Sequence, residues 1–203
     1  MIVKNDKPLM AISYDTRTFL MLKRFMHDSE PDLELLRIDP KEFILTSSNE
    51  FQYINLITKD FDERKLISKL LDDRSHDRFS YIDTEYKAVK HEHSKFGPGC
   101  FIYPGVMTYF ADFGKDVMVH GRCNFAEGVT VGDGCFFSGT VTVAGDSSIG
   151  SFCNISTNVL IMDHVTICDD VRILPATNVR KSITKPGTYY NPNAYKVEEI
   201  KLR

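Results

Sequence analysis

Residues 129–143 read VTVGDGCFFSGTVTV, and this stretch repeats one pattern every six residues. A large apolar residue recurs at Val131, Phe137 and Val143, and a small or β-branched residue lies two positions before each of them. Self-similarity at a fixed period is the sequence signature of a repeat architecture. Six residues make one short strand and a turn, so three units would close a triangular coil of eighteen residues.

The pattern extends far in both directions without an insertion. Stepping by six gives fourteen large apolar residues: Phe101, Met107, Phe113, Val119, Phe125, Val131, Phe137, Val143, Ile149, Ile155, Ile161, Ile167, Ile173 and Val179. We therefore predict a parallel β-helix that begins near residue 97 and has between four and five coils. The repeat resembles that of the hexapeptide-repeat proteins, and this resemblance, not the spacing, implies a left-handed β-helix. The large residues are expected to point inward and the small ones to line the corners.

The first ninety residues follow a different pattern, in which short apolar runs alternate with helical spacing. Strands are expected over residues 8–13, 33–38, 51–57 and 79–82. Helices are expected after Asp15 or Thr16 and again after Asp62. Strands separated by helices predict a small parallel α/β domain. The expected organisation is an α/β domain over 1–90, the β-helix over 91–183 and a C-terminal extension over 184–203.

Composition excludes several classes of protein. The chain has 203 residues, 42% hydrophobic and 26% charged, with a net charge of -3, which is ordinary for a folded protein and gives no basic coat for nucleic acid. No run of 18 apolar residues predicts a membrane span, and the N-terminus lacks a secretory signal pattern, so a cytoplasmic location is expected.

Cysteine usage supports the same interpretation. The five cysteines are odd in number and include no CxxC pair, so we expect free thiols, no disulfide framework and no metal site. Cys123, Cys135 and Cys153 fall in the small-residue column, which indicates a packing role.

A coil of eighteen residues stacks position i on position i+18. This places Asp146, Asp163 and His164 within one coil step of each other. A carboxylate beside an imidazole is a general-base arrangement. The alternative is that these are ordinary corner residues, because exposed turns collect Asp, Asn, Gly and His. A second stack, His120 above Ser138, is a weaker candidate because no acid partner is evident.

The two-part organisation resembles the sialic-acid-operon and bacillosamine-type nucleotide-sugar acetyltransferases, whose N-terminal domain is Rossmann-like. The resemblance covers most of the chain. It is carried by Ile54-Asn55-Leu56-Ile57 followed by Asp62-Glu63-Arg64-Lys65, by Tyr81-Ile82-Asp83, by residues 97–105, by Arg180-Lys181-Ser182-Ile183 and by Asn191-Pro192.

The resemblance implies an enzyme that transfers acetyl from acetyl-CoA to an amino group of a nucleotide-linked sugar in surface-glycan biosynthesis. It also implies a cytoplasmic homotrimer that neither binds nucleic acid nor inserts into a membrane. The catalytic residues expected within this reaction are those that the stacking brings together, His164, Asp146 and Asp163. The implied residues for acetyl-CoA are Asn154, Met162, Pro175, Lys181 and Lys185. The implied residues for the sugar substrate are Tyr14, Arg17 and Ser138.

The chain departs from the family pattern in four places. The glycine-rich nucleotide loop is replaced by residues 13–18, which contain no glycine. The usual Glu-His pair is Ala144-Gly145, and the usual Gly-Gly pair one coil later is Asp163-His164. The C-terminal part is about one coil shorter. Two alternatives therefore stay open: a carbohydrate O-acyltransferase with a relocated base, and a catalytically degenerate scaffold or regulatory homologue.

Overall fold

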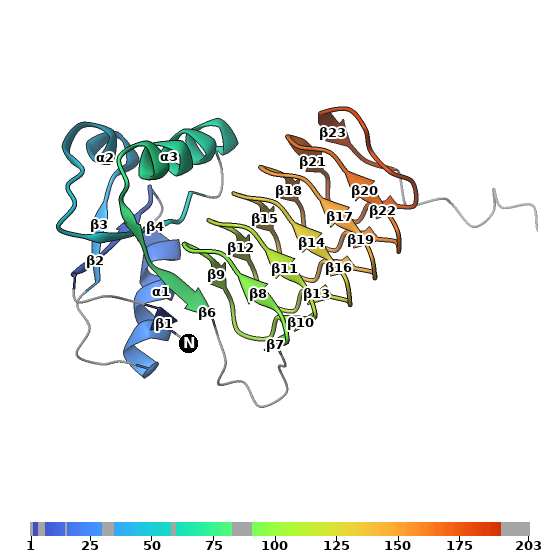
Figure 1. Ribbon diagram of the computed structural model, residues 1–203, viewed down its shortest axis with the longest axis horizontal. Coiled ribbons are helices and arrows are strands. Elements are labelled where there is room, and N and C mark those ends of the chain that lie inside the picture. Colours follow the sequence, from blue (N-terminus) through green and yellow to red (C-terminus); the bar gives the residue numbers. More distant parts are fainter. Residues whose placement is uncertain are drawn as a thin grey trace, which may run out of the picture.

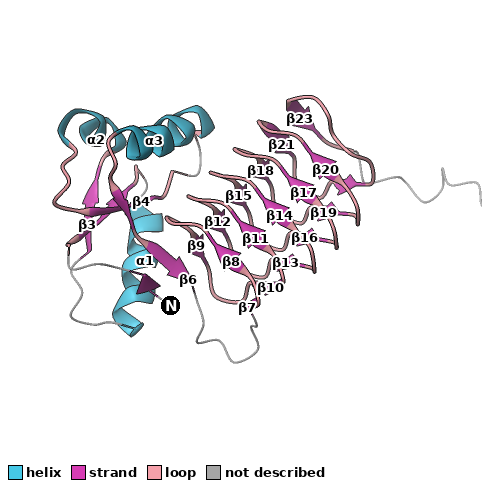
Figure 2. Cartoon of the chain, viewed as in Figure 1, coloured by secondary structure: helices cyan, strands magenta, loops and turns pink. Residues whose placement is uncertain are grey.

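The computed structural model describes residues 2–3, 7–14, 16–29, 35–57, 60–82 and 91–191. The chain forms a small α/β part that lies against one end of a long stack of coils (Figure 1). Helices occur only in the α/β part of the described residues (Figure 2). None of the helices in these ranges is both long and apolar enough to cross a bilayer.

The α/β part is built on a four-stranded parallel sheet of order β3-β2-β4-β5. Its strands are β2 (Leu9–Ile12), β3 (Leu35–Ile38), β4 (Gln52–Asn55) and β5 (Asp77–Arg78). Its helices are α1 (Thr16–Ser29), α2 (Pro40–Thr46) and α3 (Phe61–Asp73). The four strands and two helices expected from the sequence are confirmed within a few residues, but the strand expected over 79–82 belongs to another sheet.

Helix α2 follows the strand expected over 33–38, at a place where the sequence spacing predicts no helix. The Asp39 carboxylate accepts a hydrogen bond from the Lys41 amide at 2.9 Å and caps the helix, and Pro40 occupies its first turn. Proline is tolerated there because a first-turn N–H has no partner within the helix. Helix α3 likewise begins one residue earlier than expected, since Asp60 is its cap and accepts from the Glu63 amide.

The repeat region is a parallel β-helix of three sheets, as predicted. One sheet, called here the covered sheet, contains β9 (Phe101–Ile102), β12 (Met118–Val119), β15 (Phe136–Phe137), β18 (Asn154–Ile155), β21 (Val171–Ile173) and β23 (Gly187–Tyr189). The second contains β7 (His91–Glu92), β10 (Met107–Tyr109), β13 (Asn124–Phe125), β16 (Thr142–Val143), β19 (Leu160–Ile161) and β22 (Asn178–Val179). The third contains β8 (Lys95–Phe96), β11 (Asp112–Phe113), β14 (Thr130–Val131), β17 (Ser148–Ile149) and β20 (Thr166–Ile167).

The β-helix has about six turns, so the prediction of between four and five was too low. It starts at β7 rather than near residue 97, and β23 adds a strand after residue 183 by pairing with β21. These end strands deviate from the hydrophobic column, which is why the six-residue count missed them.

The first coil also breaks the phase that the sequence suggested. Phe101 pairs with Met118, seventeen residues later, whereas Met118 pairs with Phe136, eighteen residues later. Ile102 and Thr108 are therefore the inward residues of this coil, both 0% exposed. Phe101 instead packs outward against the α/β part, and Met107 is 40% exposed. The prediction that both point inward was wrong, because one residue is missing before Ala111.

The interior of the β-helix is a continuous apolar column that includes four of the five cysteines. Cys123, Cys135 and Cys153 lie in the small-residue column as predicted, and the phase shift brings in Cys100 as well. Each donates its S–H to a backbone carbonyl of a following strand or corner, at 3.0–3.2 Å. Burial raises the pKa of the Cys100 and Cys123 thiols to about 12, so neither is a ready nucleophile.

Strand β6 (Ser80–Ile82) differs from the expectation that residues 79–82 complete the α/β sheet. It pairs in parallel with β9 and antiparallel with β1 (Ile2–Val3), so it extends the covered sheet instead. The chain passes from one sheet to the other within two residues, since β5 ends at Arg78. The two parts therefore share hydrogen-bonded backbone as well as side-chain packing.

Candidate active site at a corner of the β-helix

The candidate catalytic residues lie at the corner between the second and third sheets. The backbone confirms the predicted stacking, because the Asp146 amide donates to the Glu127 carbonyl at 2.9 Å and the His164 amide donates to the Gly145 carbonyl at 3.0 Å. Strand registers on both sides of the corner keep the same offset of eighteen residues. The sequence period therefore placed Asp146, Asp163 and His164 in neighbouring coils correctly.

The His164 imidazole lies between two carboxylates. Its Nδ1 is 3.8 Å from an oxygen of Asp146, and its Nε2 is 3.9 Å from an oxygen of Asp163. These distances are too long for hydrogen bonds but close enough for charge interaction. All three side chains are open to solvent in the single chain, with exposed fractions of 61–71%. Chemically, an imidazole beside carboxylates is a combination that general acid–base catalysis uses.

The backbone conformation of this corner recurs through the whole β-helix. Asp146 and His164 both have positive φ, of 54° and 56°. Every sixth residue from Phe110 onward shares this left-handed conformation: Phe110, Asp116, Arg122, Gly128, Gly134, Thr140, Asp146, Phe152, Asn158, His164, Asp170 and Ala176. Asn, Asp and His tolerate it better than most residues, but the same turn here also accepts Phe, Arg and Ala. The backbone therefore does not require an imidazole at position 164.

The residues expected to bind acetyl-CoA do not converge within one chain. Met162 and Lys181 follow β19 and β22, which places them at the same corner as His164. Asn154 lies in the covered sheet on β18, Pro175 follows β21, and Lys185 precedes β23. The acetyl-CoA site therefore remains a prediction. Of the five residues expected to form it, only Met162 and Lys181 lie at the corner of His164.

Two of the residues expected to bind the sugar substrate lie at one edge of the α/β sheet. Tyr14 follows the carboxyl end of β2, and Arg17 lies in the first turn of α1. The Tyr14 hydroxyl donates to the Glu63 carboxylate, which raises the pKa of Tyr14 to about 12 and keeps it a hydrogen-bond donor. Ser138 lies elsewhere, at a corner of the β-helix, where its hydroxyl is 2.8 Å from that of Thr157.

That edge is the topological switch point of the sheet. The chain leaves β2 toward β3 on one side, while β4 and β5 lie on the other. Ligands of open parallel sheets bind in the crevice outside the carboxyl ends of the strands at such a point. Arg37 also points to this edge, because its guanidinium donates to the Ser13 carbonyl at 3.2 Å and the Tyr14 carbonyl at 3.4 Å. The loop after β2 contains no glycine, and the side chains of Arg37 and Glu63 form hydrogen bonds with its residues Ser13 and Tyr14.

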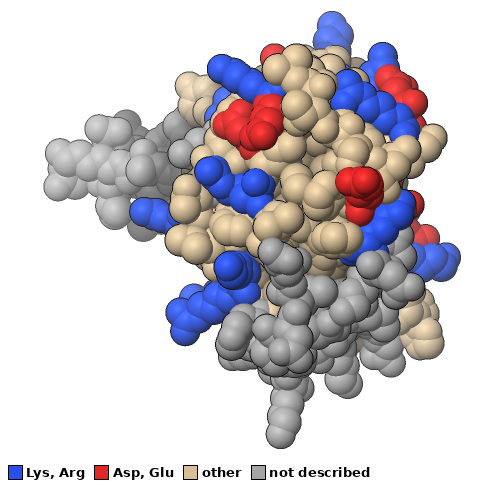
Figure 3. Space-filling view, turned by 90° about the vertical axis from the view of Figure 1, so that its left-hand side faces the viewer, with Lys and Arg blue, Asp and Glu red and all other residues tan. Residues whose placement is uncertain are grey.

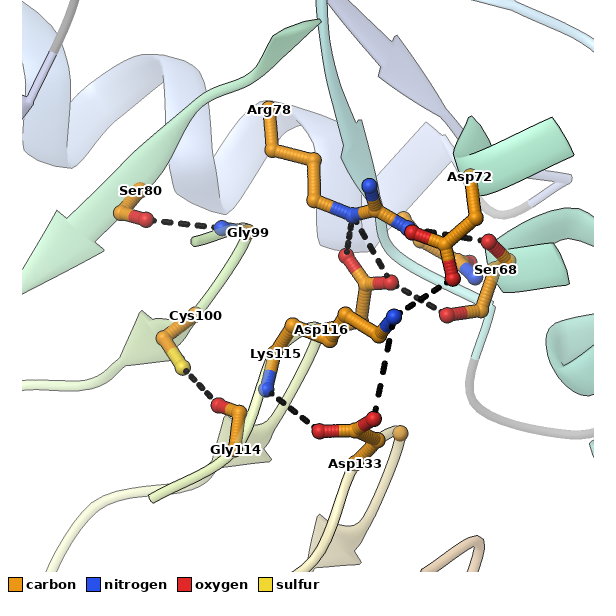
Figure 4. Close-up of polar contacts among 12 residues, drawn as sticks. Ser68, Asp72, Arg78, Ser80, Gly99, Cys100, Gly114, Lys115, Asp116 and Asp133 are labelled. Atoms are coloured by element: carbon orange, nitrogen blue, oxygen red, sulfur yellow. Dashed lines mark hydrogen bonds and ion pairs between the residues drawn. The ribbon is translucent and has the colours of Figure 1, made fainter. Parts of the chain in front are cut away.

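A buried charge cluster that the sequence analysis missed joins the two parts of the chain (Figure 4). Asp116 is 0% exposed, accepts from Arg78 Nε at 2.9 Å and also accepts from the Ser68 hydroxyl. Beside it, Lys115 bridges Asp72 of α3 and Asp133 of the next coil. In the sequence, Asp116 is visible only as a charged residue at a corner, and charged residues are equally common at corners that are exposed to water.

Arg64 is a second buried charge at the same junction, with 1% exposure. Its guanidinium donates to the carbonyls of Asn55 and Ile57 at the end of β4, at 3.0 and 2.9 Å. It also donates to the carbonyls of Gly134 and Asp116 in the β-helix. Arg64 therefore fixes the carboxyl end of β4, part of the switch point, against the covered sheet.

The remaining charges give no concentrated patch on the end face of the α/β part. Lys, Arg, Asp and Glu are interspersed there among uncharged residues (Figure 3). Across the described ranges, no three His, Cys, Asp or Glu side chains gather in a way that would hold a metal ion.

Comparison with known proteins gives both sequence and structural relatives. A 61-residue segment is 38% identical to a UDP-3-O-acylglucosamine N-acyltransferase of Albidiferax ferrireducens, and 76 residues are 36% identical to the enzyme of that name from Bordetella avium. These segments are 30% and 37% of this chain but only 18% and 21% of those relatives. No family model matches the chain.

The structural relatives cover nearly the whole chain. PerB from Caulobacter crescentus, solved with CoA and GDP-perosamine, superposes with a TM-score of 0.73 over 91% of this chain and 94% of its own, at 13% identity. The acetyltransferase domain of PglB from Neisseria gonorrhoeae, solved with acetyl coenzyme A, superposes with a TM-score of 0.72 over 91% and 96%, also at 13% identity. At this identity the likeness establishes the fold.

Proposed function

We propose that the chain transfers an acetyl group from acetyl-CoA to the amino group of a nucleotide-linked sugar, as a step of surface-glycan synthesis. The observation that carries the proposal is the architecture itself. Both the α/β part and the β-helix superpose together on two acetyltransferases, one of them solved with CoA and an amino sugar nucleotide. The shorter sequence relatives are N-acyltransferases of another nucleotide sugar, which supports the same reaction class.

In the proposed mechanism His164 is the general base. The ring removes a proton from the acceptor amine as its nitrogen attacks the thioester carbonyl. The tetrahedral intermediate then collapses, the C–S bond breaks, and the imidazolium gives its proton to the sulfur, so that CoA leaves as the thiol and His164 is neutral again. Asp146 and Asp163, at 3.8 and 3.9 Å from the ring, stabilise the imidazolium. Backbone N–H groups of the corner are the proposed donors to the oxyanion.

The exposed corner favours a site completed by a second copy of the chain. Water at three exposed side chains screens the charge interactions on which base catalysis depends. A neighbouring β-helix in a homotrimer would cover this corner and leave a groove for the pantetheine arm beside Met162 and Lys181. We expect the purified chain to run as a trimer in light scattering, and a monomer would contradict this part of the proposal.

The decisive test is acetyl transfer with matched corner variants. His164→Ala should lower kcat about 10²- to 10⁴-fold, the usual contribution of a general base. His164→Asn should lower kcat by a similar factor, because an amide cannot act as a base. Asn158→Ala is the control, because it alters another exposed corner residue of positive φ, 59°. It should keep full activity.

Two results would contradict the proposal in different ways. Absence of thermal stabilisation by acetyl-CoA, with no product from a panel of nucleotide-linked amino sugars, excludes the activity. A His164→Ala rate equal to that of the unaltered chain at every pH excludes His164 as the base and leaves a substrate-assisted route.

A further inference from the structure

The outer face of the covered sheet changes character partway along the β-helix. Successive strands pair Tyr81, Phe101, Met118 and Phe136 with one another, and all four are buried against the α/β part. The next two members of this column are polar: Phe136 pairs with Asn154, which pairs with Arg172 on β21. The apolar residues end where the α/β part stops covering the sheet.

A cavity of about 390 Å³ lies at this change of character. One wall is the start of α3, with Asp60 and Asp62, and the other is formed by Asn154 and Arg172. Phe152 and Asp170 line it at the corner. We call this space the α3 cleft. Its volume lies within the range of about 300–1,000 Å³ that small-molecule sites occupy.

The α3 cleft contains polar groups that have no partner in the described part of the chain. Asn154 is only 9% exposed, yet its side-chain amide makes no hydrogen bond with any described residue. Arg172 and Asp62 also line the cleft; both are exposed, and neither is paired with a described residue. An unpaired amide on a residue that is otherwise nine-tenths buried and that lines a cavity is available to hydrogen-bond a ligand that enters the cavity.

The other charged groups of the α3 cleft already have partners within the chain, which limits the groups that could contact a ligand. Asp170 is paired with Lys65 at 2.7 Å, and Asp60 caps α3. What remains is one amide, one carboxylate and one guanidinium. Sugar hydroxyls both donate and accept, so they satisfy an amide and a carboxylate together. A guanidinium fits phosphate oxygens in a bidentate manner.

The position of the α3 cleft agrees with this chemistry. It opens at Asp60, a few residues after the carboxyl end of β4, where the switch point of the α/β sheet lies. We propose that the α3 cleft holds the pyranose ring of the nucleotide-linked sugar, with Asn154 and Asp62 on its hydroxyls and Arg172 on the phosphate attached to it.

The inference rests on the proposed function and on its homotrimer. Phe152 and Asp170 of the α3 cleft follow β17 and β20. Asp146 and His164 instead precede these strands, so the base that acts on this sugar would come from a neighbouring copy of the chain. The inference assigns Asn154 to the sugar in place of acetyl-CoA.

Steady-state kinetics separate these two assignments. Asn154→Leu removes both hydrogen-bonding groups at similar size, and Arg172→Gln removes the charge. Each should raise KM for the amino sugar nucleotide at least 10-fold and leave KM for acetyl-CoA unchanged. Asn124→Leu, at an outward position on β13 of the second sheet, is the control and should change neither constant. A raised KM for acetyl-CoA, or no change in either constant, would overturn the proposal.

A binding measurement without acetyl-CoA keeps this test independent of the reaction. Calorimetry would compare GDP-perosamine with GDP, and UDP-glucosamine with UDP. The unaltered chain should bind at least one sugar nucleotide more tightly than its nucleoside diphosphate, and Asn154→Leu and Arg172→Gln should abolish that gain. Asn154→Ser provides a smaller change if the leucine variant does not fold.

The two proposals then fail in distinguishable ways. Sugar-dependent binding that the variants abolish, without acetyl transfer, contradicts the proposed function and supports the α3 cleft. Acetyl transfer with variants that bind the sugar nucleotide normally contradicts the α3 cleft alone.

Discussion

At the corner position of His164, the backbone conformation does not determine which side chain is present. The turn that His164 occupies demands positive φ, which several residue types satisfy elsewhere in the same β-helix. The imidazole is therefore available for chemistry without a structural duty of its own. Its two carboxylate neighbours come from the same stacking that any corner residue experiences, so their convergence is a property of the repeat.

His120 represents the opposite case, a histidine held by its surroundings. Its ring lies 4.5 Å from Tyr103 and 5.0 Å from Phe136, and its Nε2 has no partner among the described residues. Burial lowers the pKa of His120 to about 4. Because an unfolded histidine titrates near 6.5, the folded state loses stability as pH falls from about 6.5 toward 4.

The expected effect of His120 is measurable as a difference between two proteins. Chemical unfolding of the unaltered chain should lose stability over this pH interval, by no more than about 3 kcal/mol from this residue. His120→Phe keeps the aromatic contacts without titrating, so its stability should depend less on pH over the same interval. Parallel curves for the two proteins would show that His120 is not responsible.

At the scale of the element, each coil is stabilised by its neighbours through the interior column. Phe125 is 0% exposed, with its ring centroid 4.9 Å from that of Phe113 and 5.0 Å from that of Phe137. Both pairs are edge-to-face, a favourable aromatic geometry. Three consecutive coil interiors are thus linked by one aromatic ladder, and a gap in the middle removes contacts on both sides.

Phe125→Ala should accordingly lower the free energy of unfolding by about 3–5 kcal/mol, as for other buried Phe→Ala changes. Thr130→Ala on the exposed surface of β14 is the control, and it should stay within about 0.5 kcal/mol. Urea unfolding at one fixed protein concentration compares them. A loss below about 1 kcal/mol for Phe125→Ala would mean that the coils collapse around the gap.

At the scale of the whole molecule, the α/β part is fixed to the β-helix by charges as well as by apolar packing. Arg64 donates two hydrogen bonds to carbonyls of the β-helix and two to carbonyls at the end of β4, and Arg78 pairs with Asp116 beside it. This fixed junction keeps the switch point of the sheet at a set distance from the α3 cleft. The proposed nucleotide and sugar positions depend on that distance.

Loss of one partner in the buried pair should therefore be costly. Asp116→Asn keeps shape and tolerates the positive φ of 56°, but it removes the buried carboxylate that pairs with Arg78. It leaves the partly exposed Asp72, 3.0 Å away, as the one described charge partner of Arg78. The substitution should cost about 3 kcal/mol. The control is Asp112→Asn, which breaks an exposed pair with Lys95 and should cost at most about 1 kcal/mol. Adding Arg78→Met to Asp116→Asn should recover part of the loss, and strictly additive losses would contradict a coupled pair.

The sequence by itself determined the β-helix and the grouping at its corner. A six-residue period sets which residues point inward and which lie eighteen positions apart in contact, because each coil stacks only on its neighbours. This is why Asp146, Asp163 and His164 were placed together correctly. The same rule failed in the first coil, which is one residue shorter than the others and therefore has Phe101 on its outer side. A constant period of six does not show where a single coil is shorter.

Only the tertiary structure decided how the two parts meet. Four features depend on contacts between residues at least 20 positions apart: the buried Arg64, the Arg78–Asp116 pair, the transfer of β6 to the covered sheet and the α3 cleft. No local propensity encodes such contacts. A charged residue at a corner looks the same in the sequence whether it faces water or a buried guanidinium, and only packing distinguishes the two.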